Sequence, residues 1–78
     1  MAYLAARMKI KADAVIQWVD KNLPPLSWRI IVMKQMKLLL KHKISPANID
    51  GTTYFNEEIM MELKQLIKND YGKDLPSF

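Results

Sequence analysis

The sequence contains no cysteine, one histidine and two glycines among its 78 residues. Without cysteine, neither a disulfide framework nor a thiolate zinc site can form. His42 cannot build a metal site alone, and two glycines are too few for a phosphate-cradling loop. We therefore expect no metal and no cofactor. The lack of cysteine also fits a reducing compartment, so we expect a cytoplasmic protein.

Long apolar runs are missing as well. Lysines interrupt every hydrophobic stretch before it reaches the roughly 18–20 residues that a membrane span needs. We expect a soluble chain with no membrane partner. The first eleven residues, MAYLAARMKIK, are basic and free of acid, as in an organelle presequence, but they lack serine and continue unbroken into the next segment. We therefore interpret these eleven residues as part of the folded domain and not as a presequence.

Groups suited to catalysis are also few. His42 lies among lysines near a predicted helix end, and the helix start around Glu57 and Glu58 explains those carboxylates without catalysis. The three serines read as caps, turns or tail: Ser27, Ser45 and Ser77. We expect no catalytic residues and no enzyme.

Charge and hydrophobicity are the informative features that remain. Residues 1–44 carry nine Lys or Arg against two Asp, a net charge of +7, whereas residues 45–78 carry three Lys against six acids, a net charge of −3. A positive half suits an anionic partner such as DNA or an acidic protein surface, unless the two halves neutralise each other in the fold. Half the residues are hydrophobic, which is high for one small domain and indicates a homodimer or a protein partner.

Periodicity predicts a first helix over residues 2–22, which ends before Pro24 and Pro25. Its apolar stripe recurs every three or four residues: Leu4, Met8, Ala12, Val15 and Val19. An alternative is a shorter helix from Ala14, capped by Asp13, with the residues before it as an arm.

A second helix is expected over residues 28–43, capped by Ser27. Apolar residues cover most of its circumference, with a basic stripe opposite at Lys34, Lys37 and Lys41. The broad apolar face and its margins comprise Trp28, Ile31, Val32, Met33, Met36, Leu38, Leu39 and Leu40.

Residues 44–55 are predicted to be a hairpin or a loop, since Asp50-Gly51 between two short β-like runs favours a primed turn with positive φ at glycine. Asn56 then caps a helix over residues 57–70, which Gly72 ends. This helix buries Ile59, Leu63, Leu66 and Ile67. The tail, residues 73–78, is loosely held unless Leu75 and Phe78 dock. The fold class is a mainly α, compact three-helix domain with a β-hairpin or loop between helices two and three.

The run LLLKHKISPANIDGTTYFNEEIMMEL, residues 38–63, resembles the wing and last helix of winged-helix DNA-binding domains in phage excisionases and mercury-resistance-type regulators. The resemblance implies that Lys41 and Lys43 end a recognition helix and that Ile49 to Phe55 form a wing. It also implies that Thr52 and Thr53 meet the DNA backbone or minor groove. Unlike those families, this chain has a second helix that is apolar nearly all round.

Two functions follow from these features. The first is a small DNA-binding accessory or regulatory factor that contacts phosphates through Arg29, Lys34, Lys37, Lys41 and Lys43, with Thr52 and Thr53 on the wing. If so, the lysine stripe should share a surface with Arg7 or Lys9. The alternative is a helical protein–protein interaction module, an inhibitor or adaptor, that uses Trp28, Met33 and Met61.

Overall fold

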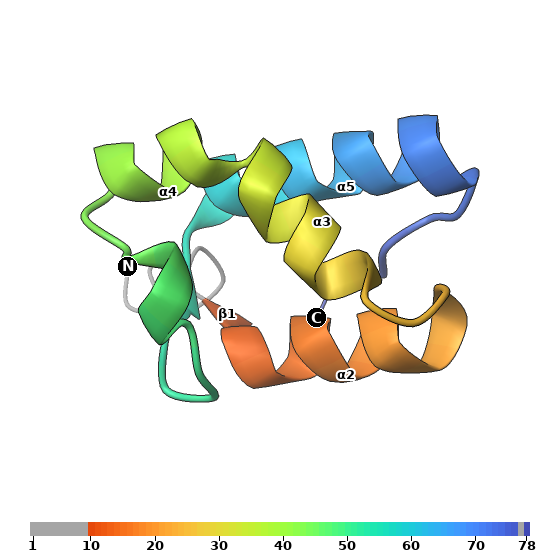
Figure 1. Cartoon of the computed structure of the whole chain (residues 1–78), viewed down its shortest axis with the longest axis horizontal. Helices are drawn as coiled ribbons and strands as arrows, with labels where there is room; N and C mark the ends of the chain where they lie inside the picture. Colours follow the sequence, from red (N-terminus) through yellow and green to blue (C-terminus); the bar gives the residue numbers. More distant parts are fainter. Residues whose placement is uncertain (1–9, 77) are drawn as a thin grey trace.

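The computed structural model describes residues 10–76 and 78 (Figure 1). Over these residues the chain has four α-helices, two short strands and one 3-10 helix. In chain order they are β1 (Ile10–Lys11), α2 (Ala12–Asn22), α3 (Ser27–Lys34), α4 (Met36–Lys41), η1 (Pro46–Asn48), β2 (Tyr54–Phe55) and α5 (Glu57–Tyr71). The predicted mainly α fold class is confirmed. The expected second helix is present as two helices, α3 and α4, and the one short antiparallel strand pair of the described chain joins β1 to β2.

In the view of Figure 1, α2 and α5 lie along opposite long sides of the molecule, and α3 runs obliquely between them. The buried residues of all the helices meet in one core. Its largest fully buried side chains are Phe55, Ile31, Ile59, Ile67, Val15 and Val19. Of the predicted stripes, Ala12, Val15 and Val19 of the first and Ile59, Leu63 and Ile67 of the last are buried, whereas Leu66 is only half-buried.

Helix α2 begins at Ala12, directly after a strand, and the part of the predicted first helix over residues 2–9, with Leu4 and Met8, lies outside the described residues. Asp13 does not cap it: Lys11 is the N-cap residue and makes no side-chain cap bond, while Asp13 Oδ2 accepts a 3.1 Å hydrogen bond from Gln17 Nε2. The Ala12 N–H donates instead to the Thr53 carbonyl over 2.7 Å. The helix ends at Asn22, before the two prolines, as expected.

The strands pair across the molecule and not within residues 44–55. Ile10 pairs with Phe55 and Lys11 with Tyr54, in antiparallel register. The segment before β2 is therefore a loop that contains η1 and a turn, in which Thr53 N–H donates to the Asp50 carbonyl over 3.1 Å. The wing that the resemblance implied over Ile49 to Phe55 is not formed, because β2, the only strand in this segment, pairs with β1, which directly precedes α2.

The predicted second helix is divided at Gln35, which has φ −100° and ψ 15°. No Pro or Gly marks this position. Helix α3 packs against both α2 and α5, whereas α4 turns toward η1. Ser27 is not the cap either: Leu26 occupies that position, and the buried Ser27 hydroxyl donates to the Pro24 carbonyl over 2.6 Å.

The last helix and the tail follow the prediction more closely. The Asn56 side chain caps α5 by accepting from the Ile59 N–H, and Gly72, with φ 68°, ends the helix in the left-handed conformation. Leu75 is buried against the core, so this part of the tail docks. Phe78 remains half exposed.

Candidate interaction surface

Exposed apolar side chains are concentrated on and next to α3 and α4. Of the eight large hydrophobic residues that are exposed in the described chain, five fall between residues 26 and 40, on or next to these two helices. They are Leu26, Ile30, Met33, Met36 and Leu40. We call these five residues, together with the exposed cations Arg29 and Lys37, the α3–α4 face.

Helical spacing explains why one side of α3 is exposed. Ile30 and Met33 are three residues apart and therefore share one side of α3, and Leu26 directly precedes the helix as its N-cap residue. The opposite side carries Ile31 and, on α4, Leu39, which are 0% and 2% exposed. Residues 26–40 thus contain more apolar side chains than are buried in the core, and the remaining ones are exposed.

Leu26 has an unusual backbone conformation for its position. It has φ 68°, in the left-handed region that costs energy for residues other than glycine, and its side chain is 68% exposed. The turn formed by Pro24 and Pro25 thus holds a leucine in solvent at the start of α3. Burial in the core therefore does not explain why a leucine occupies this position.

The predicted basic stripe is only partly available to a partner. Lys34 pairs with Asp70 of α5, and that hydrogen bond, with the charge of Asp70, raises the pKa of the lysine. Lys41 Nζ lies 3.1 Å from Glu58 Oε1, also on α5. These two lysines therefore fasten α3 and α4 to α5.

The other basic residues of the proposed DNA surface are Arg29, Lys37 and Lys43. All three are exposed and make no ion pair with an acid in the part of the chain that the structure describes. Arg7 and Lys9, expected on the same surface as the lysine stripe, lie outside the described residues. Of the cations predicted to contact DNA, those without an acidic partner in the described chain therefore lie beside the apolar side chains of the α3–α4 face or follow them in the sequence.

Thr52 and Thr53, placed at the tip of the expected wing, are engaged in the turn around Asp50. Thr52 donates to Asp50 Oδ1 from its N–H over 2.8 Å and from its hydroxyl over 2.6 Å. The Asp50 N–H donates to Thr53 Oγ1 over 3.2 Å. These hydrogen bonds account for the turn without a ligand. Those from Thr52 hold the pKa of the Asp50 carboxyl below its ordinary value.

The other two proposed interface residues lie in different surroundings. Trp28 is half-buried, with its ring centroid 6.1 Å from that of Phe55, so it belongs to the edge of the core. Met61 lies on α5 and is 62% exposed, close to the 69% of Met33. Sequence periodicity placed Met33, Met36 and Leu40 on the broad apolar face of the second helix or its margins without separating an exposed side from a buried one, and it did not single out Leu26 or Ile30. The sequence feature that could have indicated these exposed residues is the excess of apolar residues around the second helix.

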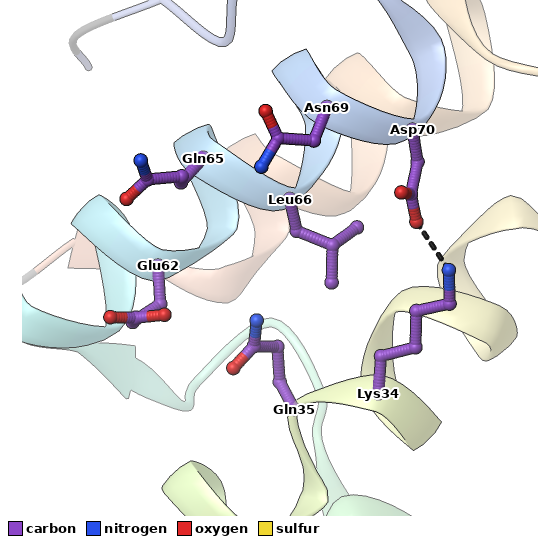
Figure 2. A pocket seen from close by; sticks show the side chains of 7 residues that line it. All are labelled: Lys34, Gln35, Glu62, Gln65, Leu66, Asn69 and Asp70. Atoms are coloured by element: carbon purple, nitrogen blue, oxygen red, sulfur yellow. Dashed lines mark hydrogen bonds and ion pairs between the residues drawn. The ribbon is translucent and has the colours of Figure 1, made fainter.

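A hollow of about 270 Å³ lies between the junction of α3 with α4 and helix α5 (Figure 2). Its lining is Lys34, Gln35, Glu62, Gln65, Leu66, Asn69 and Asp70. Figure 2 shows Lys34 and Asp70 pointing toward one another at one side of it. No histidine, cysteine, serine or threonine lines it, so it holds neither a Ser–His nor a Cys–His pair. Within the described chain no group of three or more His, Cys, Asp or Glu could hold a metal ion.

Comparison of the chain with protein-family models, with curated proteins and with solved structures gave no match. None of the described helices is long and apolar enough to cross a membrane.

Proposed function

We propose that this chain is a small, non-enzymatic protein-interaction module that docks a partner through the α3–α4 face. The observation that carries the proposal is the run of exposed apolar residues at helical spacing, Leu26, Ile30 and Met33, next to a fully buried Ile31. Contiguous apolar surface of this kind marks interaction sites on soluble proteins. A domain of this size fits an inhibitor or an adaptor.

The same surface is poorly suited to reading DNA sequence. Base edges in the major groove are read by side chains such as Arg, Asn and Gln. The exposed side of α3 presents Leu26, Ile30 and Met33 instead, and of the lysines around it Lys34 is paired with Asp70. These contacts favour apolar docking over base readout.

Site-specific photo-crosslinking tests the proposal. A photoreactive amino acid is placed at Met33 and, in a second variant, at Met61, which is nearly as exposed but lies on α5. In cells of the source organism, we expect a discrete protein adduct from position 33 and none from position 61. No adduct at 33, or the same adducts from both sites, contradicts the proposal. Adducts from 61 alone place the interface on α5 and also contradict it.

A second candidate is phosphate contact with DNA, favoured by Arg29, Lys37 and Lys43, which lack an acidic partner among the described residues. Lysine and arginine contacts to phosphate give affinity that falls steeply with salt. Fluorescence anisotropy with a generic labelled duplex, titrated at several salt concentrations, tests this. Binding should weaken with salt and be reduced in Lys37→Glu but not in Lys73→Glu, a matched charge reversal in the tail. Binding unaffected by Lys37→Glu contradicts this candidate.

A further inference from the structure

We infer that the partner of the α3–α4 face is an amphipathic helix whose apolar stripe is flanked by carboxylates. This inference rests on the protein-interaction function proposed above and adds the chemistry of the partner.

Each helix of the face presents residues at helix-packing spacing. Ile30 and Met33 are three apart on α3, and Lys37 and Leu40 are three apart on α4, beyond the bend at Gln35. Leu26 precedes α3 as its N-cap residue. A helical partner can therefore follow the exposed side of α3 for about two turns.

The charge of the face is of one sign. No Asp or Glu occurs in the sequence between Asp20 and Asp50, so the whole segment that carries the face is free of acid. Asp70 and Glu58 of α5 are already paired with Lys34 and Lys41. Arg29 and Lys37 are left on the face itself, and a partner that covers them must supply the opposite charge.

A second copy of this chain does not supply it. In a two-fold arrangement, the same residues of both copies meet around the axis. The segment that carries the face contains no Asp or Glu, so a second copy would bring only its own Arg29 and Lys37 to the interface. These like charges oppose association.

The separation of the two cations also indicates where the partner carries its acids. Arg29 lies on α3 and Lys37 on α4, on either side of the bend at Gln35. Carboxylates at both ends of the partner's apolar stripe, on its margins, can therefore reach the two cations.

Three designed helical peptides test this chemistry. They share one leucine stripe and differ only at the flanking positions, which are all Glu, all Gln or all Lys. Binding of each labelled peptide to the full chain is measured by fluorescence anisotropy. We expect the Glu peptide to bind roughly tenfold more tightly than the Gln peptide, the Lys peptide to bind most weakly, and the difference to shrink with salt.

Charge reversal on the protein provides the matched control. The double variant Arg29→Glu and Lys37→Glu should exchange the preference and bind the Lys peptide best. The double variant Lys21→Glu and Lys73→Glu makes the same change of net charge at exposed positions outside the face, and it should retain the preference for the Glu peptide. Circular dichroism of both variants checks that they are folded.

Each other outcome has a definite reading. If the three peptides bind equally, or none binds while Met33 gives its adduct in cells, the acidic-helix inference is overturned and the interaction function stands. If no peptide binds and Met33 gives no adduct, both fall. Tighter binding of duplex DNA than of the Glu peptide, lost in the Arg29 and Lys37 double variant, makes the partner nucleic acid. Dimerisation that protects Met33 would identify the partner as a second copy of this chain and would overturn the inference.

Discussion

Asn56 joins two helices by using both ends of its side-chain amide. Its Oδ1 accepts a 2.9 Å hydrogen bond from the Ile59 N–H and so caps α5, while its Nδ2 donates to His42 Nδ1, 3.1 Å away, at the end of α4. Since His42 Nδ1 accepts, its Nε2 carries the proton and donates to Glu58 Oε2 over 2.7 Å. The end of α4 is thus fastened to the first turn of α5.

The cap predicts the effect of removing the amide. Asn56→Ala loses the acceptor for Ile59 and should lower the free energy of unfolding by about 1–2 kcal/mol. Urea denaturation followed by circular dichroism measures the change. Asn56→Asp keeps an acceptor for Ile59 but loses the donor to His42, so its loss should be smaller. An alanine variant as stable as the parent chain would show that the cap contributes nothing.

The Glu58 carboxylate predicts a dependence of stability on pH. Hydrogen bonds from His42 and then Lys41 hold its pKa below the ordinary value of 4.5. A carboxyl whose pKa is lowered by folding stabilises the folded state fully above its ordinary pKa, and this contribution is lost as the pH falls through the lower, folded value. Urea midpoints measured from pH 7 to pH 3 should therefore decrease below about pH 4.5.

The variants separate Glu58 from the other carboxylates. Glu58→Gln should flatten the acid part of this profile, because an amide does not titrate. Glu57→Gln removes the neighbouring carboxylate, which is exposed and makes no ion pair within the described residues, and it should leave the slope in place. Equal slopes in the parent chain and in Glu58→Gln would contradict the assignment.

The helices could be predicted because their signals are local. The prolines after Asn22, the Asn56 cap and the Gly72 stop each act through the backbone within a few residues, and each lies where the sequence placed it. The buried sides of α2 and α5 followed from spacing for the same reason.

The features that the sequence did not predict have no local signal. Tyr54 pairs with Lys11, which is far away in the sequence, and no Pro or Gly marks the division of the helix at Gln35, so periodicity cannot detect either feature. The α3–α4 face was missed for a related reason. A helix that is apolar nearly all round gives no local indication of which side the other helices cover, so the exposed Met36 and Leu40 could not be distinguished from the buried Ile31 and Leu39.

The two glycines differ in a way that substitution can test. Gly72 has φ 68°, so Gly72→Ala forces alanine into the left-handed region and should cost roughly 1 kcal/mol of stability, with Gly72→Asn costing less. Gly51 does not have the positive φ expected of a primed turn, and an added Cβ would meet Asp13 Cβ at 3.5 Å, an ordinary contact. Gly51→Ala should therefore be nearly neutral. Thermal melts of the three variants measure this, and equal losses at both glycines would contradict it.

Two adjacent leucines on α4 should separate folding from binding. Leu39 is 2% exposed and Leu40 is 56% exposed. Leu39→Ala leaves a cavity in the core and should cost about 2–5 kcal/mol, a large part of the stability of so small a domain. Leu40→Ala removes apolar surface that already faces water, so its effect on stability should stay within about 0.5 kcal/mol. If the α3–α4 face is the docking surface, Leu40→Ala should nevertheless weaken binding of the Glu-flanked peptide. Urea denaturation and peptide anisotropy on the same two variants measure both quantities, and a Leu40→Ala chain that is strongly destabilised, or that binds the peptide unchanged, contradicts the assignment of this residue to an exposed docking surface.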